Sequence, residues 1–182
     1  VNVVRYGQYL KVAENNILNR ELADKLRNAS RYDFLTGLKN RNALNMDFEN
    51  PKNPSLNSNF IIMVTDLDDF KSFNDTKGHQ FGDQVLKQYA SILQTNFGKK
   101  FCYRYGGDEY LLVLPEISEE EFLKKIKICE DAIKGEFHFS GGYTRGFVSN
   151  SKDLHVLISK ADQNLYQAKG SGKNKIIGSF TE

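Results

Sequence analysis

The chain has 182 residues, of which 40% are hydrophobic and 26% charged. This is the composition of an ordinary globular protein with room for one core. Its net charge of +2 gives no reason to expect a nucleic-acid partner, because proteins that bind phosphate backbones usually carry a basic excess or stripe. Two cysteines without paired spacing indicate neither a disulfide framework nor a zinc site, and they fit a reducing cytoplasm. Apolar runs such as Phe60–Val64 are too short to span a bilayer, so we expect no membrane contact by this domain.

Residues Tyr9–Ser30 contain no Pro or Gly and predict a helix. One stripe of this helix is apolar, at Leu10, Ala13, Ile17, Leu18, Leu22 and Leu26. The helix could pack on its own domain or pair with a second chain. We favour pairing as a signalling helix, because a helix that precedes a compact domain has little core of its own to cover. The stripe is too short and irregular to predict a coiled coil.

The next segments alternate between helices and strands. A short helix follows Asn40, and the polar stretch Pro51–Asn59 is typical of a loop. The continuous apolar run Phe60–Val64 indicates a central strand buried on both faces. An apolar face then repeats at helical spacing from Asp83 to Phe97.

The second half predicts a hairpin, two helices and two more strands. The hairpin strands are Phe101–Tyr105 and Tyr110–Leu114. Ser118 with Glu121 three residues later is a capping box for a helix. A strand near 137–147, a helix over 153–169 and a short strand over 175–177 complete the order. We therefore expect an α/β (α+β) fold with a mainly antiparallel five-stranded sheet flanked by helices.

Three carboxylates, Asp66, Asp68 and Asp69, follow the central strand within four residues. They repel one another, so a cation is a natural occupant of this cluster. Strand alternation points Asp66 and Asp68 to one side. A solvated acidic turn is the alternative interpretation, and the cluster alone does not exclude it.

The tip of the hairpin reads Gly106-Gly107-Asp108-Glu109. The two glycines remove side chains where a backbone must turn tightly or a bulky group must approach. A plain hairpin turn needs at most one glycine beside Asp or Asn, and it does not need two acids directly afterwards. The tip is therefore a better candidate for chemistry than for a simple turn.

Further polar residues lie beyond the central strand and near the end of the chain. Lys71, Asn74, His79 and Asp83 are expected in the loop and helix start after the strand. Amide and carboxylate groups suit the donor edge of guanine, although Asp83 could also be a helix N-cap. Lys169 and Lys173 flank Gly170-Ser171-Gly172 as a phosphate clamp would, although lysine near a helix C-terminus is also ordinary capping.

Taken together and in order, these segments resemble the GGDEF family of diguanylate cyclases. The resemblance covers about Arg31–Gly178 and divides the chain into a signalling helix (1–30), a catalytic domain (31–178) and a tail (179–182). It is carried by five separate blocks of sequence: Asp33-Phe34-Leu35-Thr36-Gly37-Leu38-Lys39-Asn40-Arg41, Asp66-Leu67-Asp68-Asp69-Phe70-Lys71-Ser72-Phe73-Asn74-Asp75, Gly78-His79-Gln80-Phe81-Gly82-Asp83, Arg104-Tyr105-Gly106-Gly107-Asp108-Glu109-Tyr110, and Ala161-Asp162 with Tyr166-Gln167-Ala168-Lys169.

The resemblance implies a fold, an activity and a set of roles. The fold would be a ferredoxin-like core similar to the palm of adenylyl cyclases. The activity would be magnesium-dependent condensation of two GTP into cyclic di-GMP and two pyrophosphates. Two metal ions would be held at each site, with manganese able to substitute. The metal ligands would come from Asp66, the Leu67 carbonyl, Asp108 and Glu109, with Asp108 and Glu109 as the catalytic acids.

The same resemblance places GTP and a second subunit. Its contacts to GTP would come from Asn74, Asp83 and His79, from Asp69, Phe70 and Lys71, from Gly106 and Gly107, and from Lys169 and Lys173. Each domain would hold one GTP, so turnover would need a homodimer. We expect an output domain of a bacterial signalling protein, cytoplasmic, with an upstream sensor or membrane anchor missing because the chain begins at Val1.

Two positions depart from the family pattern. Tyr110 stands where the signature normally ends in Phe, and its ring can fill the same pocket if its hydroxyl finds a partner. Phe97 and Lys100 stand where many members carry the Arg and Asp of an inhibitory product site. Two other functions remain as alternatives: a non-catalytic nucleotide-binding domain, and an enzyme that makes a mixed cyclic GMP–AMP, whose relatives carry Ser at the position of Asp83.

Overall fold

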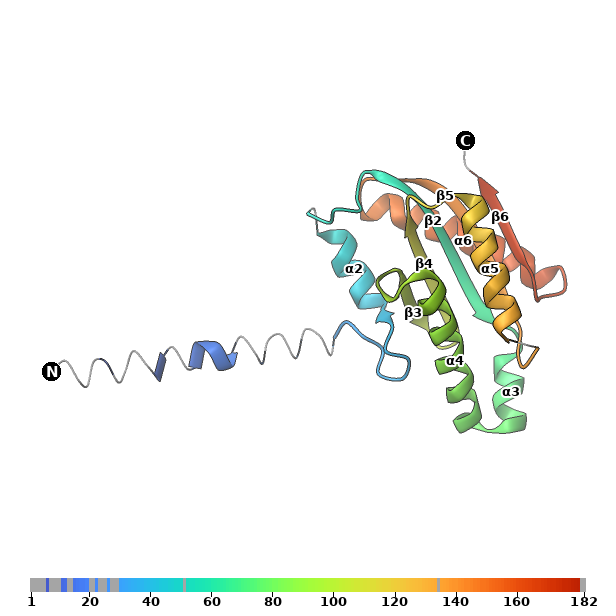
Figure 1. Ribbon diagram of the computed structural model, residues 1–182, viewed down its shortest axis with the longest axis horizontal. Coiled ribbons are helices and arrows are strands. Elements are labelled where there is room, and N and C mark those ends of the chain that lie inside the picture. The colour runs from blue at the N-terminus through green and yellow to red at the C-terminus, as the bar shows by residue number, and fades with distance from the viewer. Residues whose placement is uncertain are drawn as a thin grey trace.

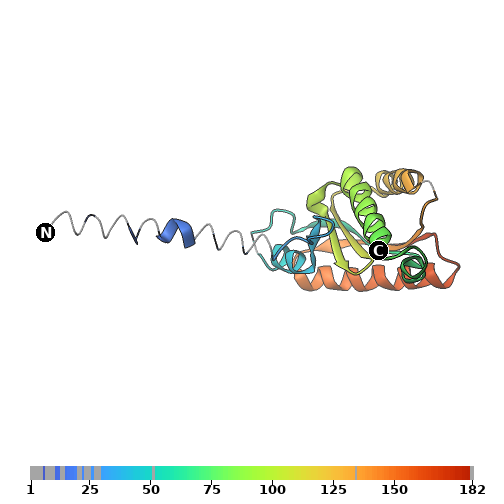
Figure 2. The same cartoon turned by 90° about the horizontal axis from the view of Figure 1, so that it is seen from below.

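The computed structural model describes residues 30–50, 52–133 and 135–180, together with residues 6, 11, 12, 15–19, 22 and 26. Within these residues the chain folds into a twisted sheet covered by helices on both faces (Figures 1 and 2). This agrees with the α/β prediction. None of the described helices is long and apolar enough to cross a membrane.

The sheet has six strands in the order β1-β3-β4-β2-β5-β6. Strand β2 (Ser58–Leu67) lies between β4 (Glu109–Pro115) and β5 (Phe139–Val148) and is antiparallel to both. Strand β3 (Cys102–Gly106) pairs antiparallel with β4, and β6 (Ile176–Phe180) runs parallel to β5. The sixth strand, β1 (Lys39–Asn40), runs parallel to β3. It was not among the five predicted strands because two residues show no periodicity.

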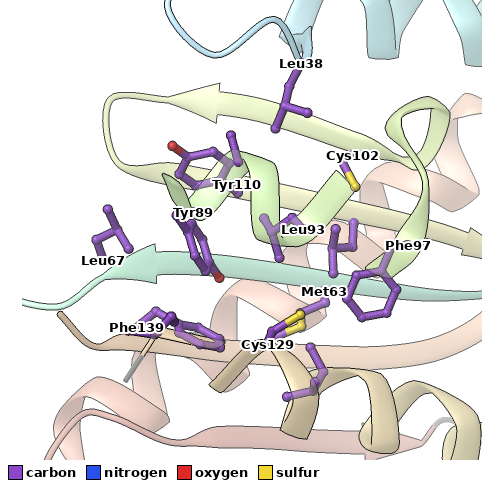
Figure 3. Close-up of a cluster of buried hydrophobic side chains, with 14 of the residues drawn as sticks. Leu38, Met63, Leu67, Tyr89, Leu93, Phe97, Cys102, Tyr110, Cys129 and Phe139 are labelled. Atoms are coloured by element: carbon purple, nitrogen blue, oxygen red, sulfur yellow. The ribbon is translucent and has the colours of Figure 1, made fainter. Parts of the chain in front are cut away.

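The helices form a layer on each face of the sheet. Helices α4 (His79–Phe97) and α5 (Glu119–Ile133) cover one face, and α2 (Arg41–Glu49) and α6 (Ser151–Gly170) cover the other (Figure 2). Ile61 and Met63 of β2 point into the first layer, while the alternate residues of the strand pack in the second. Strand β2 is therefore buried on both faces, as predicted. Figure 3 shows the core under α4, where Tyr89 lies beside Tyr110.

The segment after β2 is a helix rather than the expected loop. Helix α3 (Phe70–Lys77) ends at Gly78, and α4 begins at His79. Gly78 has a φ of 88°, which glycine adopts readily because it has no Cβ atom. The prediction that Asp83 caps α4 is wrong, because Gly78 occupies the cap and Asp83 lies in the second turn. Gly78 joins two consecutive helices where a loop and a helix start were expected.

The described residues before Ser30 contribute no core to this domain. They are helical at positions 11, 12, 15–19, 22 and 26, as predicted for this stretch. Ile17, Leu18, Leu22 and Leu26 are each more than half exposed, so the described part of the stripe does not pack on the domain. Leu10 and Ala13 of the predicted stripe lie outside the described residues.

Candidate active site

The acidic end of β2 meets the glycine-rich hairpin. Asp66 is directly opposite Glu109 in the β2–β4 ladder. The backbone N–H of Leu67 donates to the carbonyl of Asp108 at 3.4 Å. The antiparallel register therefore brings all four residues predicted as metal ligands to one edge of the sheet.

Asp66 is buried, with 9% of its surface exposed. The solvated-turn interpretation is wrong for this residue. Burial raises the pKa of its carboxyl group above the ordinary value, the hydrogen-bonded ammonium of Lys169 opposes this, and the charges of Asp108 and Glu109 raise the pKa further. The site thus concentrates negative charge that one lysine does not neutralise.

The donor set at this edge suits a magnesium ion. No group of three or more His, Cys, Asp or Glu side chains in the described residues forms a complete metal cage. Magnesium is commonly held by one or two carboxylates together with water and substrate phosphates. Asp66 and Asp108, with the carbonyl oxygen of Leu67, supply that number of protein donors.

Both candidate phosphate-binding lysines reach the same edge. The ammonium group of Lys169 lies 2.7 Å from Asp66, and that of Lys173 lies 2.5 Å from Asp69. Each ammonium group thus pairs with a carboxylate of the candidate site, and Lys169 also lies in the last turn of α6, where a basic residue is ordinary. Asp69, with φ of 56°, turns the chain into α3, where Phe70 packs against the core and Lys71 is exposed.

Asn74 and Gly82 mark the contact between α3 and α4. The side-chain oxygen of Asn74 is buried and accepts no hydrogen bond within the described residues. A Cβ atom at position 82 would lie 1.8 Å from this oxygen, so only glycine permits the approach. Asp83 is the next residue along α4. A buried acceptor without a donor is costly, which makes this oxygen a candidate to receive a ligand N–H group.

Gly82→Ala should weaken binding of guanine nucleotides. The added methyl group must displace the Asn74 amide, and loss of one buried hydrogen bond to the base costs about 1 kcal/mol or more, roughly a fivefold loss of affinity. Titration with GMP measures this. Ser91→Ala, at an exposed position of the same helix, serves as the control. An unchanged affinity in Gly82→Ala would contradict the placement of the base beside Asn74.

The side chain of Arg104 in β3 hydrogen-bonds to the backbone of the hairpin tip. Its Nε and Nη2 atoms donate to the carbonyl of Gly107 at 3.0 and 2.7 Å, and its Nη1 atom donates to Asp33 at 2.9 Å. Asp33 also accepts from the backbone N–H and the hydroxyl of Thr36. Arg104 and Asp33 were part of the sequence match, but their contact across 71 positions was not predicted.

Tyr110 stands where the family signature normally has Phe, and its buried hydroxyl group has a hydrogen-bond partner. It donates to the carbonyl of Leu86 in α4 at 2.9 Å, and the ring lies edge-on to Tyr89 at 4.9 Å between centroids (Figure 3). Strand β4 is thereby joined to the helix that carries Asp83. Burial raises the pKa of Tyr110 well above its ordinary value, so the phenol stays protonated and donates.

Tyr110→Phe should lower the free energy of unfolding by only about 1 kcal/mol, because the change removes one neutral hydrogen bond and leaves no buried donor unpaired. The backbone carbonyl of Leu86 still accepts its hydrogen bond within α4 after the substitution. Chemical denaturation measures the change, and nucleotide binding should stay within about twofold of the original. A loss above about 3 kcal/mol would show that the hydroxyl does more than the structure indicates.

Other predicted residues lie near this edge without contacts of their own. In the described part of the chain, the side chains of Lys71, His79 and Asp83 form no hydrogen bond or ion pair and are exposed. His79 is the first residue of α4. A Cβ atom at Gly107 would meet nothing within 4 Å, whereas at Gly106 it would approach Glu109 at 3.1 Å. The tip is therefore open on the side of Gly107.

The sequence matches the family model described as "Diguanylate cyclase, GGDEF domain" over residues 30–175. Diguanylate cyclase DgcZ of Escherichia coli is 33% identical over 159 residues, covering 81% of this chain and 53% of DgcZ. Response regulator PleD of Caulobacter vibrioides is 29% identical, covering 96% of this chain and 39% of PleD. This chain thus spans about half, or less, of the length of these curated relatives.

Solved structures give the same result for the fold. The coiled coil and GGDEF domain of DgcB from Caulobacter crescentus, in complex with c-di-GMP, superposes with a TM-score of 0.80 at 25% identity, covering 93% of this chain and 95% of that one. Diguanylate cyclase SiaD from Pseudomonas aeruginosa, in complex with its activator SiaC, superposes with a TM-score of 0.72 at 27% identity, covering 98% of this chain and 73% of that one.

Proposed function

This chain belongs to the GGDEF family of diguanylate cyclases, and we propose that it condenses two GTP molecules into cyclic di-GMP and two pyrophosphates. The observation that carries the proposal is the edge of the sheet where buried Asp66 meets Asp108 and Glu109 with two lysines alongside. Three regions far apart in the sequence supply these groups. A domain that only binds a nucleotide has no need of this concentration of carboxylates.

Asp66, Asp108 and the carbonyl of Leu67 would hold magnesium, with Glu109 beside them. Bound magnesium, at two ions per site and with manganese as a substitute, would neutralise triphosphate charge and lower the pKa of the attacking 3′-hydroxyl. Asp108 and Glu109 are the candidates to accept the proton of that hydroxyl. Gly106 and Gly107 leave room at the tip for a triphosphate.

The start of α3 and the two lysines would bind the phosphates. Backbone N–H groups from Asp69 to Lys71 lie at the positive end of α3, which favours anions. Lys71 is exposed there, and Lys169 and Lys173 reach the same edge. These groups would stabilise charge on the β- and γ-phosphates as pyrophosphate leaves.

The base of GTP would lie against the junction of α3 and α4. The unpaired oxygen of Asn74 would accept from a guanine N–H, and Asp83 would accept from the N1–H and the amine. His79 lies at the start of the same helix. This set of acceptors favours guanine over adenine, which does not present both donors.

The reaction requires two copies of the domain. In each step a ribose 3′-oxygen bonds to the α-phosphorus of the other GTP, the bond to the bridging oxygen breaks, and pyrophosphate leaves. A nucleotide cannot place its own 3′-oxygen in line behind its own α-phosphorus. We therefore propose that the active form is a homodimer that serves as the output of a bacterial signalling protein in the cytoplasm.

Incubation with GTP and magnesium, followed by identification of the products by mass, tests the function. The expected product is cyclic di-GMP with two pyrophosphates per molecule. Nucleotide binding without product would favour a non-catalytic domain. A mixed cyclic GMP–AMP formed from GTP and ATP together would favour the other alternative.

Asp83→Ser should relax the discrimination between GTP and ATP. A hydrogen bond from guanine to a carboxylate contributes on the order of 1.5–3 kcal/mol, so the ratio of kcat/KM values should fall at least about tenfold. Asp75→Ser, at an exposed carboxylate of α3, is the matched control. A preference for GTP that stays unchanged in Asp83→Ser would remove Asp83 from the base-binding site.

A further inference from the structure

Asp68 lies between two residues of the candidate site, and each of its carboxylate oxygens accepts a hydrogen bond from the protein. Its Oδ1 atom accepts from the hydroxyl of Ser140 at 2.8 Å, and its Oδ2 atom accepts from the backbone N–H of Asn174 at 2.8 Å. Ser140 is completely buried in β5, so this donor has a fixed position. Asp68 therefore links the end of β2 to the loop between α6 and β6.

That loop has an unfavourable backbone. Lys173 and Asn174 have φ of 60° and 47°, directly after Gly172 with φ of 112°. Residues with a Cβ atom rarely adopt this left-handed region, so other contacts must hold the loop. Within the loop, the Lys173 N–H donates to the carbonyl of Ala168 at 3.1 Å, and the Gly172 N–H donates to the carbonyl of Lys169 at 3.4 Å. The bond from the Asn174 N–H to Asp68 ties the loop to the end of β2.

The neighbouring acid holds the side chain of the same loop. The ammonium group of Lys173 lies 2.5 Å from Asp69, which is at the start of α3. Asp68 thus fixes the backbone next to Lys173, and Asp69 sets the direction of its side chain. Two consecutive acids bring a lysine from more than a hundred positions away to the end of the helix that would bind phosphates.

Asp68 differs in its contacts from the carboxylates at the metal edge. Asp66 lies opposite Glu109 of the hairpin, whereas Asp68 contacts β5 and the α6–β6 loop. Both oxygens of Asp68 are held by donors on β5 and on the α6–β6 loop, so the carboxylate has a fixed orientation toward that loop. Its position suits an orienting role.

We propose that Asp68 is a positioning residue that holds the Lys173 loop in place to bind the β- and γ-phosphates of GTP. The inference rests on the proposed function, because it assigns Lys173 to the phosphates. It differs from the expectation that all three acids after the central strand share a cation.

Two substitutions separate positioning from metal binding. Asp68→Ala removes both acceptors, whereas Asp68→Asn keeps an acceptor for the Asn174 N–H and can donate to the Ser140 hydroxyl. We expect Asp68→Ala to raise KM for GTP roughly tenfold with kcat within about threefold, and Asp68→Asn to stay within about threefold in both constants. Asp131→Ala, at an exposed acid of α5, controls for the loss of surface charge.

Equilibrium binding supplies a readout that does not need turnover. GMP carries the base and one phosphate, whereas GTP also carries the groups that Lys173 would bind. Calorimetry with magnesium and a GTP analogue whose α–β bridge cannot be cleaved should show Asp68→Ala weakening the analogue roughly tenfold while GMP stays within about twofold. Equal losses for both nucleotides would indicate a general structural defect, and an Asp68→Asn variant as defective as Asp68→Ala would indicate a metal ligand. Either result would overturn the proposal.

Amide hydrogen exchange tests the loop itself in the protein alone. The N–H of Asn174 should exchange roughly tenfold faster in Asp68→Ala and near the original rate in Asp68→Asn. An unchanged rate in Asp68→Ala would refute the positioning of the loop. If the unsubstituted protein binds GTP but makes no cyclic di-GMP, the proposed function fails while the GTP–GMP comparison still decides the role of Asp68.

Discussion

Asp66→Asn should reduce formation of cyclic di-GMP by on the order of a thousandfold or more. The substitution keeps the size of the side chain and removes a charge from the edge where β2 meets the hairpin. A carboxylate that holds a catalytic cation contributes several kcal/mol to the stability of the transition state, and about 1.4 kcal/mol corresponds to each tenfold change in rate. Initial rates at saturating GTP and magnesium measure the effect.

The same variant should remain folded. Because the pKa of Asp66 is raised in the folded state, this carboxyl contributes to stability below its unfolded pKa, and the contribution is lost as the pH rises through the folded value. At neutral pH the ionised side chain opposes folding, so Asp66→Asn should melt no lower than the original protein without magnesium. The difference should shrink as the pH is lowered. A variant that melts lower at neutral pH would leave its inactivity without a specific explanation.

Asp69→Asn is the matched comparison for Asp66→Asn. It also removes one carboxylate charge from the same segment, but Asp69 is exposed and pairs with Lys173 rather than lying at the metal edge. It should affect KM for GTP more than kcat. A loss of kcat in Asp69→Asn equal to that in Asp66→Asn would contradict the separation of metal and phosphate roles.

The fold could largely be predicted because the strands and long helices carry strong patterns. The run from Phe60 to Val64 is apolar on both faces, and it lies between two helix layers. The helix predicted over 153–169 was found as α6, and its apolar residues from Leu154 to Ala168 form its buried face. The start of α4 was misplaced because Gly78 ends one helix and caps the next, and such a junction looks like a loop in sequence.

The sequence predicted which residues belong to the candidate site, but it did not predict which of them contact one another. Asp66, Asp108 and Lys169 were identified by their place in the motifs, and the register of β2 with β4 explains why two of them meet. The bond of Asp68 to Asn174 spans 106 positions, and that of Arg104 to Asp33 spans 71. A single sequence holds no signal for pairings at such separations. The three acids at the end of β2, Asp66, Asp68 and Asp69, look alike in sequence, but each has a different partner in the structure.

The rate per protomer should rise with protein concentration. If two domains must meet to align a 3′-hydroxyl with the α-phosphorus of the other GTP, the active fraction depends on association, and below the dissociation constant the rate per protomer is proportional to concentration. The exposed apolar residues before the domain, Ile17, Leu18, Leu22 and Leu26, offer a helix for pairing. A helix of about three heptads associates weakly by itself. Dilution over roughly a hundredfold range should therefore lower the rate per protomer by up to that factor.

Two variants test whether association is the cause. A strong parallel dimerising helix fused before Val1, in a register that lets the two sites face, should make the rate per protomer independent of dilution. Leu18→Gln combined with Leu22→Gln should lower the rate without lowering the melting temperature, because both side chains are exposed and contribute nothing to the core. Light scattering reports the mass of the species at each concentration. A constant rate per protomer from a species that stays monomeric throughout would mean that one domain completes the reaction, and the shared site would have to be abandoned.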